Sequence, residues 1–177
     1  MPAHVFGYGS LVAGGHAPAR LRGHRRVWGV AMDNRLAVPG YKVYEAPDGA
    51  RPPVAVAFLD LEPDAGSVVD GALLEVDDAA LERLDRRERQ YRRIDVSGAI
   101  DPPPDGTVWT YVGREEGRDR VARGRAGAAR VVIQRAYVEL VERAFGGLGP
   151  EALARYRATT EPPPFPVVEL ARVDLAP

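Results

Sequence analysis

The chain has 177 residues, of which 45% are hydrophobic and 28% charged, values typical of one globular domain. Its 24 Lys and Arg nearly cancel its 25 Asp and Glu, and this net charge of −1 disfavours a nucleic acid or an anionic membrane as partner. Cysteine is absent and only three histidines occur, which excludes disulfides and thiolate metal ligands and disfavours a histidine-rich metal site. The N-terminal residues do not resemble a signal peptide, and no apolar run approaches the ~20 residues of a membrane span, so we expect a cytoplasmic protein.

Short β-type segments fill the first half of the chain. Runs of β-branched and aromatic residues between turn residues predict five strands, at 4–6, 21–32, 41–44, 54–61 and 68–76. Residues 62–66 (EPDAG) are typical of a turn between the last two of these strands.

Helical patterns appear later in the chain. Asp77 or Asp78 is suited to cap a helix that runs to Tyr91, and Gly146-Gly147 is suited to end a helix whose apolar positions begin near Val132. The remaining predicted elements are a strand at 94–100, a loop at 101–106, a strand at 107–112, a surface loop at 113–127, a helix at 150–159 and an extended segment at 161–166.

This order of elements predicts the fold class. Strands dominate the first two thirds and helices the last third, with little β-α-β alternation, a pattern typical of an α+β protein. The order alone favours a mainly antiparallel sheet or a small barrel. As the complete expectation we take a small mixed β-barrel or strongly curved sheet with flanking helices, formed by one domain over residues 1–160. Residues 161–177 form a Pro-rich C-terminal extension with a possible edge strand at 167–173, to which the sequence assigns no role.

Glu88 is the most informative polar residue. At ~100° per residue, with Leu81 at zero, Tyr91 falls at about 280°, Leu84 at about 300° and Glu88 at about 340°, so a carboxylate lies inside the apolar arc. One interpretation is an ion pair with Arg92 one turn later, worth only about 0.3–0.5 kcal/mol. The other is a carboxyl held against apolar surface, where its pKa rises toward neutrality and suits general acid–base catalysis.

A glycine-containing loop follows the first strand. Gly7-Tyr8-Gly9-Ser10-Leu11 lacks the third glycine of a dinucleotide-binding loop, the Gly-Lys-Ser/Thr of a P-loop and the flanking glycines of a nucleophile elbow. One interpretation is a plain tight turn in which the glycines use φ values closed to other residues. The other is a loop whose uncovered N–H groups bind a carboxylate or an oxyanion.

Together these two segments resemble the gamma-glutamylcyclotransferase-like superfamily. Residues 5–11 (VFGYGSL) are similar to the family's Tyr-Gly-Ser substrate loop, and residues 84–93 (LDRRERQYRR) to its Leu-Asp-x-x-Glu…Tyr-x-Arg helix. The resemblance extends from residue 5 to about residue 160. Ser10-Leu11 stands where some members have Ser-Asn, which leaves the subfamily and the substrate open.

The resemblance implies an enzyme that needs no cofactor or metal. Family members let the α-amine of a γ-glutamyl amide attack its own γ-carbonyl, which gives 5-oxoproline and a free amine. In that scheme Glu88 moves the proton and the N–H groups of Tyr8, Gly9, Ser10 and Leu11 bind the substrate carboxylate or the oxyanion. Tyr91 and Tyr111 are candidates for lining the pocket.

Two other functions stay open at this point. The same fold can serve as a non-catalytic small-molecule-binding or interaction module, although such a module gains nothing from a carboxylate on an apolar face. An amidase of another type is less favoured because no Ser–His or Cys–His pair can be assembled. The partner is expected to be a small γ-glutamyl compound, with no nucleic acid and no membrane, and the sequence specifies neither that compound nor the oligomeric state.

The other conspicuous residues receive structural interpretations. Arg25 and Arg26 are expected on a strand surface, and Trp28 and Trp109 in the core. The histidines, His4, His16 and His24, are interpreted as incidental.

Overall fold

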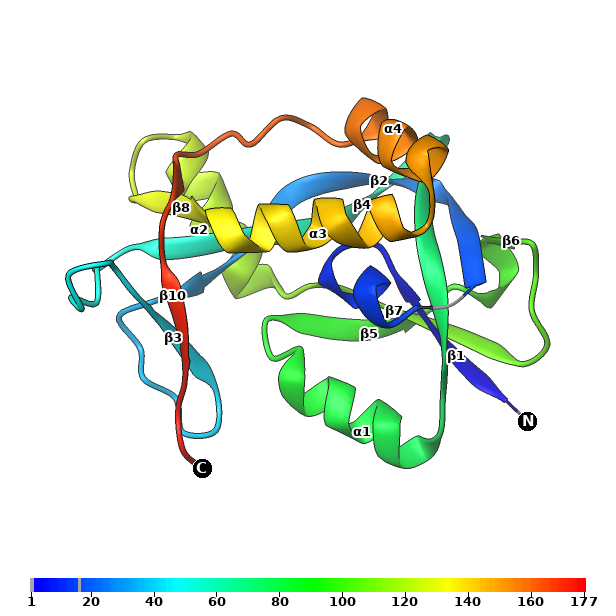
Figure 1. Ribbon diagram of the computed structural model, residues 1–177, viewed down its shortest axis with the longest axis horizontal. Helices are drawn as coiled ribbons and strands as arrows, with labels where there is room; N and C mark the ends of the chain where they lie inside the picture. The colour runs from blue at the N-terminus through cyan, green and yellow to red at the C-terminus, as the bar shows by residue number, and fades with distance from the viewer. Residues whose placement is uncertain (1, 16) are drawn as a thin grey trace.

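The computed structural model describes residues 2–15 and 17–177 and forms one mixed sheet flanked by helices (Figure 1). The sheet has eight strands in the order β5-β7-β1-β4-β2-β6, with β8 added to β4 and β9 to β8. Its strands are β1 (Ala3–Gly7), β2 (Ala17–Asp33), β4 (Ala55–Val76), β5 (Tyr91–Asp95), β6 (Ile100–Asp101), β7 (Thr107–Gly113), β8 (Val131–Gln134) and β9 (Val167–Val168). A separate two-stranded ribbon pairs β3 (Lys42–Glu45) with β10 (Ala171–Asp174).

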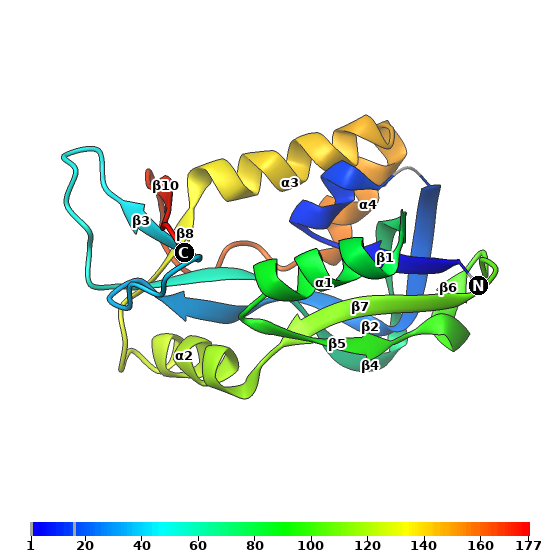
Figure 2. The same cartoon turned by 90° about the horizontal axis from the view of Figure 1, so that it is seen from below.

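The described residues also form four α-helices and two short 3-10 helices. They are α1 (Asp78–Arg87), α2 (Glu115–Arg125), α3 (Arg135–Gly147), α4 (Pro150–Thr159), η1 (Ser10–Gly14) and η2 (Ser97–Ala99). Helices α3 and α4 lie on one side of the sheet and α2 on the opposite side (Figure 2). The α+β class and the strongly curved sheet expected from the sequence are therefore confirmed.

The long antiparallel pair β2–β4 forms the centre of the sheet. The sequence predicted two strands separated by a turn at 62–66, and this prediction is wrong because β4 runs without interruption from Ala55 to Val76. The turn-forming residues instead bulge out of β4, where Asp64 accepts hydrogen bonds from Gly66 N and Ser67 Oγ at 3.3 and 2.9 Å. The register shifts at this bulge, so the turn chemistry bends the strand rather than reversing the chain.

Helix α1 begins where the sequence predicts and ends earlier. The Asp77 side chain caps it by accepting the N–H of Ala80 at 2.6 Å. The helix ends at Arg87, not at Tyr91, because Tyr91 already pairs with Gly113 at the start of the β5–β7 ladder. Leu81 on its buried face packs against Val5 of β1.

Three further segments differ from the predictions. Residues 94–100 are not one strand, because Ser97 donates N–H and Oγ–H bonds to Asp95 and turns the chain into η2. Residues 113–127 contain α2 in place of the predicted surface loop. Residues 131–134 form β8, which pairs in parallel with β4, so α3 begins at Arg135 and not near Val132.

The Pro-rich segment beyond residue 160 packs onto the sheet. Val167 pairs with Ile133, and β10 pairs with β3 along its whole length. Leu170, between the two short strands, is 7% exposed and belongs to a core cluster with Met32 and Phe58.

The expectation that Arg26 lies on a strand surface is wrong. Arg25 is exposed as expected and pairs with Glu62 at 2.7 Å, but Arg26 is 1% exposed. Its guanidinium donates to the carbonyls of Tyr8 and Asp70 and to Thr160 Oγ1.

The two tryptophans, both expected in the core, differ in their burial. Trp28 is buried as expected, whereas Trp109 is only partly buried, with the Arg93 guanidinium over its ring at 4.9 Å. His24 Nδ1 lies 3.2 Å from the carbonyl oxygen of Arg22, to which it can only donate, and His16 lies outside the described residues. Within the described part of the chain, every helix is too short or too polar to cross a membrane.

Candidate active site

A small pocket lies where η1, the end of α1 and the first turns of α3 converge. Its volume is about 30 Å³. It is lined by Tyr8, Gly9, Ser10, Leu11, Leu59, Glu88, Tyr91, Tyr111 and Tyr137. All seven site residues proposed from the sequence thus meet around one pocket, although they come from segments up to about 100 positions apart.

The loop after β1 presents backbone rather than charged side chains to this pocket. The chain leaves β1 at Gly7 and enters η1, where Val12 donates its N–H to Gly9 O at 3.0 Å. The N–H groups of Ser10 and Leu11, at the start of η1, have no acceptor within that turn.

The expectation that the loop glycines use positive φ is wrong. Gly9 has a φ of −133°, and Gly7 is not among the positive-φ residues. The need for glycine is one of space: a Cβ on Gly9 would lie 3.0 Å from the Tyr137 hydroxyl oxygen, and a Cβ on Gly7 would lie 2.8 Å from Leu11 Cβ.

Glu88 is the acidic side chain that reaches the small pocket. It caps the C-terminus of α1, with its N–H bonded to Leu84 O at 2.8 Å, so the helical direction of its side chain is retained after the helix ends. Its side chain is only 14% exposed. The interpretation as an ion pair with Arg92 is wrong, because the cation that contacts Glu88 is Arg87, whose Nε lies 3.2 Å from Oε1.

Burial dominates the electrostatics of Glu88. Desolvation raises the pKa of its carboxyl above the ordinary value, and Arg87, Lys42 and Arg172 oppose this rise without cancelling it. A carboxyl with a raised pKa is a better proton acceptor than a solvated one, so Glu88 combines access to the pocket with basicity suited to proton transfer.

Hydroxyl groups of four tyrosines surround the pocket, and three of them donate to protein oxygens. Tyr8 donates to Tyr111 O at 2.7 Å, Tyr91 to Leu59 O at 2.9 Å and Tyr111 to Asp85 at 2.7 Å. Burial raises the pKa of Tyr8 and Tyr91 well above the usual value, so both side chains stay neutral and act as fixed walls.

The sequence reasoning missed two residues that line the small pocket, Leu59 and Tyr137, and Tyr137 is the polar one. Its oxygen accepts the N–H of Leu59 at 3.4 Å, and its hydroxyl proton has no acceptor among the described residues. The only sequence signal was its place on the apolar side of the predicted α3, which is equally typical of a core residue.

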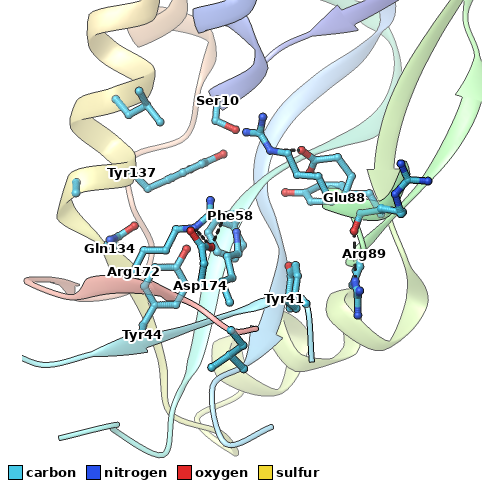
Figure 3. Close-up of a pocket in the computed structure, with 18 of the residues that line it drawn as sticks. Ser10, Tyr41, Tyr44, Phe58, Glu88, Arg89, Gln134, Tyr137, Arg172 and Asp174 are labelled. Atoms are coloured by element: carbon cyan, nitrogen blue, oxygen red, sulfur yellow. Dashed lines mark hydrogen bonds and ion pairs between the residues drawn. The ribbon is translucent and has the colours of Figure 1, made fainter. Parts of the chain in front are cut away.

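A larger cavity adjoins the small pocket and shares four of its lining residues, Ser10, Glu88, Tyr91 and Tyr137 (Figure 3). Its volume is about 640 Å³. The β3–β10 ribbon contributes Lys42, Tyr44, Arg172 and Asp174 to its wall, and the end of α1 contributes arginines. Sequence reasoning missed Lys42 and Arg172 because neither belongs to a motif, and the ribbon joins segments about 130 residues apart.

No group of three or more His, Asp or Glu side chains that could hold a metal ion occurs within residues 2–15 and 17–177. The site therefore combines one largely buried carboxyl, a loop whose first N–H groups lack an acceptor within their own turn, and four tyrosine side chains. It shares lining residues with a larger cavity that is rich in cationic side chains.

The fold is that of an α+β protein whose curved sheet carries a pocket with one largely buried carboxyl, and a family model identifies its class. The model described as "Gamma-glutamyl cyclotransferase, AIG2-like" matches residues 5–126, and the chain belongs to this family. The matched segment contains all seven proposed site residues and Lys42, and it excludes Tyr137 and Arg172. A search of curated proteins by sequence finds no significant match.

Solved structures show the same fold at low sequence identity. A protein described as a gamma-glutamyl cyclotransferase is 13% identical, with a TM-score of 0.57 and coverage of 93% of this chain and 91% of the other. The human protein described as uncharacterized protein loc79017 is 14% identical, with a TM-score of 0.55 and coverage of 92% and 89%. YkqA from Bacillus subtilis is 18% identical, with a TM-score of 0.53, and this chain covers 53% of its length.

Proposed function

We propose that this protein is a cyclotransferase that converts a γ-glutamyl amide into 5-oxoproline and a free amine, with Glu88 as general acid and base. The observation that carries the proposal is the Glu88 carboxyl, which is largely buried, has a raised pKa and lines the same pocket as the loop of residues 8–11. Membership of the family supports the reaction class.

In the proposed reaction the α-amino nitrogen of the substrate attacks the γ-carbonyl carbon of the same molecule. Glu88 as carboxylate removes a proton from the α-ammonium group, which frees the nitrogen lone pair. The new C–N bond closes the five-membered ring and the original amide C–N bond breaks. Glu88 returns this proton to the departing amide nitrogen, takes the second proton from the ring nitrogen and passes it to the released amine, which leaves as an ammonium ion. The enzyme therefore ends in the state in which it began.

In this proposal the backbone N–H groups at the start of η1 bind the carbonyl oxygen of the reacting amide. The carbonyl oxygen gains negative charge during the attack, and N–H groups aimed at that position stabilise it without any charged side chain. Because the attack is intramolecular, the remaining work is to hold the substrate folded with its amine close to its carbonyl carbon.

The sizes of the two cavities suggest how the substrate lies. The small pocket, at about 30 Å³, has the volume of roughly one water molecule and holds a carboxylate or carbonyl group rather than a whole glutamyl group. The rest of the substrate then passes Glu88 and extends into the 640 Å³ cavity.

The proposal is tested by incubating the purified protein with γ-glutamyl amino acids, a γ-glutamyl dipeptide and a γ-glutamyl alkylamine, and by measuring 5-oxoproline and free amine by NMR. We expect both products in equal amounts from at least one compound, and none with the Glu88→Gln variant. Tight binding of a γ-glutamyl compound without any product would instead favour the non-catalytic binding module.

A further inference from the structure

Lys42 forms no ion pair with any carboxylate of the described residues, although Glu88 and Asp174 attract it from a greater distance. It is the only lysine in the chain and lines the larger cavity from β3. Its ammonium nitrogen lies 4.5 Å from the centroid of the Phe58 ring and 5.6 and 5.8 Å from those of Tyr41 and Tyr44. Among the described residues no carboxylate lies within ion-pair distance of Lys42, and no hydrogen bond is formed by its side chain.

The aromatic enclosure stabilises the charged lysine only in part. Cation–π contacts favour an ammonium group over these rings, but removal from water disfavours it, and burial lowers the pKa of Lys42 to about 8. A partly buried cation of this kind gains most from an anion that arrives with a ligand, because the surrounding rings keep water away from the pair.

The cavity as a whole carries excess positive charge. Among the side chains of its described lining, five are cationic and two are carboxylates. The cations are Lys42, Arg86, Arg87, Arg89 and Arg172, and the carboxylates are Glu88 and Asp174. This balance attracts an anionic ligand group into the cavity.

Most of these cations already have protein contacts. Arg87 contacts Glu88, and Arg89 lies over the Tyr41 ring and donates to Arg86 O. Arg172, opposite Tyr44 on the β3–β10 ladder, holds Asp174 with its Nε and Nη2 at 2.7 and 2.6 Å and is half exposed. Lys42 is therefore the cation best suited to bind a ligand anion, with Arg172 beside it as a second donor.

We propose that Lys42, assisted by Arg172, binds a carboxylate on the amine portion of the γ-glutamyl amide and thereby selects γ-glutamyl amino acids and peptides over γ-glutamyl alkylamines. This proposal rests on the proposed function, since it assigns the part of the substrate that leaves as the free amine. With the reacting amide at Glu88, the leaving portion extends across the cavity toward Arg172 and Tyr44 (Figure 3).

The test compares γ-glutamyl-alanine with γ-glutamyl-ethylamine, which differs only in lacking the alanine carboxylate. The ratio of their kcat/KM values is measured for the wild type and for Lys42→Met, Lys42→Arg and Arg172→Met. We expect Lys42→Met, which keeps an unbranched chain over Phe58 without the charge, to lower the ratio about 10- to 100-fold. Lys42→Arg should restore part of the ratio, and Arg172→Met should lower it less, because Arg172 is half exposed and already bound to Asp174.

Arg83→Met is the matched control, since it removes a cation from the exposed face of α1 outside both pockets and should leave the ratio unchanged. An unchanged ratio in Lys42→Met overturns the proposal. Equal losses for both compounds overturn it as well, because they mean that Lys42 binds the glutamyl portion.

A binding measurement separates this proposal from the proposed function. Calorimetry with Glu88→Gln compares the affinities for the two compounds with and without the added Lys42→Met change. A Lys42-dependent preference for γ-glutamyl-alanine supports the carboxylate subsite even if the wild type forms no 5-oxoproline. Equal affinities overturn the subsite, whereas 5-oxoproline release by the wild type would still uphold the reaction.

Discussion

At the scale of single residues, burial raises the free energy of the ionised form of Glu88. Its carboxyl has lost most of its water, and the three cations around it compensate only in part, so its pKa is raised. The folded protein therefore keeps the Glu88 proton to a higher pH than the unfolded chain does, where the pKa of a glutamate is ~4.3.

We predict that Glu88→Gln makes the protein more stable relative to the wild type as the pH rises. Because the folded pKa is raised, the free energy of unfolding that Glu88 contributes is complete below pH ~4.3 and is lost as the pH rises through the folded pKa. Glutamine does not titrate, so the stability difference should grow in favour of the variant between pH 4 and 7. Urea unfolding at several pH values measures it.

The control for this prediction is Glu82→Gln on the same helix, whose side chain is 73% exposed. Because this side chain is largely in water, the change should alter the free energy of unfolding much less than Glu88→Gln does. A difference between Glu88→Gln and the wild type that stays constant or shrinks with rising pH would contradict a raised Glu88 pKa.

Arg26 connects the loop of the site to the core, and we predict that Arg26→Met destabilises the protein by about 2–5 kcal/mol. The change leaves the buried carbonyls of Tyr8 and Asp70 without their donor. Its neighbour Arg25, exposed and paired with Glu62, is the control, and Arg25→Met should change the unfolding midpoint little. Similar midpoints for the two variants would argue against a structural role for Arg26.

These two residues also show what the sequence can predict at this scale. The direction of Glu88 was predictable because it depends on local helix periodicity, which persists to the C-cap. The burial of Arg26 was not predictable, since its hydrogen-bond partners come from segments 18, 44 and 134 residues away. Tyr91 reaches the pocket as predicted, but it does so from β5 rather than from the helix.

At the scale of elements, α2 is a helix that packing stabilises. Its sequence is rich in arginine and glycine, and of its side chains only Val121 is a buried apolar one. Arg118 donates to the fully buried Asp60 at 2.9 Å and to Leu61 O, which fixes the helix against β4. Gly117 lets the helix backbone come close to β2, because a Cβ there would lie 2.5 Å from Val30 Cγ2.

We predict that Gly117→Ala destabilises the protein by about 1–3 kcal/mol, although alanine alone favours a helix over glycine by about 1 kcal/mol. The added methyl group overlaps Val30, whose side chain is fully buried. The control is Gly146→Ala in α3, where the nearest atom to the new Cβ is 3.9 Å away, and this change should be neutral or slightly stabilising. Thermal melts that rank the two variants in the opposite order would contradict the packing of α2.

Elements with strong local signals were predictable and the others were not. The Asp77 cap, the glycines that end α3 and Pro150 at the start of α4 act within one turn, and each marks its boundary correctly. The start of α3 was wrong because pairing with β4 draws residues 131–134 into the sheet, and α2 was missed because its contacts are tertiary.

At the scale of the whole molecule, the segment after residue 160 acts as part of the domain. It adds β9 to the sheet, completes the β3–β10 ribbon and contributes Arg172 and Asp174 to the large cavity. Glu161 accepts a hydrogen bond from Trp28 N of β2 and pairs with Arg125 of α2, so the segment also connects to both of these elements.

We predict that Leu170→Ala lowers the free energy of unfolding by about 2–5 kcal/mol, because Leu170 is buried in the core cluster with Met32 and Phe58. Leu36→Ala is the control, since Leu36 is 55% exposed and its truncation should cost less than about 0.5 kcal/mol. If denaturant unfolding shows equal, small effects, the segment after residue 160 does not contribute to the core.

The sequence predicted the α+β class and the curved sheet because the order of strands and helices limits the possible architectures. It did not predict the ribbon that closes the large cavity, because Lys42 and Arg172 carry no motif and their proximity depends on the pairing of β3 with β10.

The most direct test of the central claim measures turnover and affinity separately for the wild type and Glu88→Gln, with whichever γ-glutamyl compound the wild type converts fastest. Glutamine keeps the shape of the side chain but cannot carry the proton, so kcat for 5-oxoproline release should fall about 10²- to 10⁴-fold while the dissociation constant changes little. A variant that turns over near the wild-type rate would contradict the role assigned to Glu88.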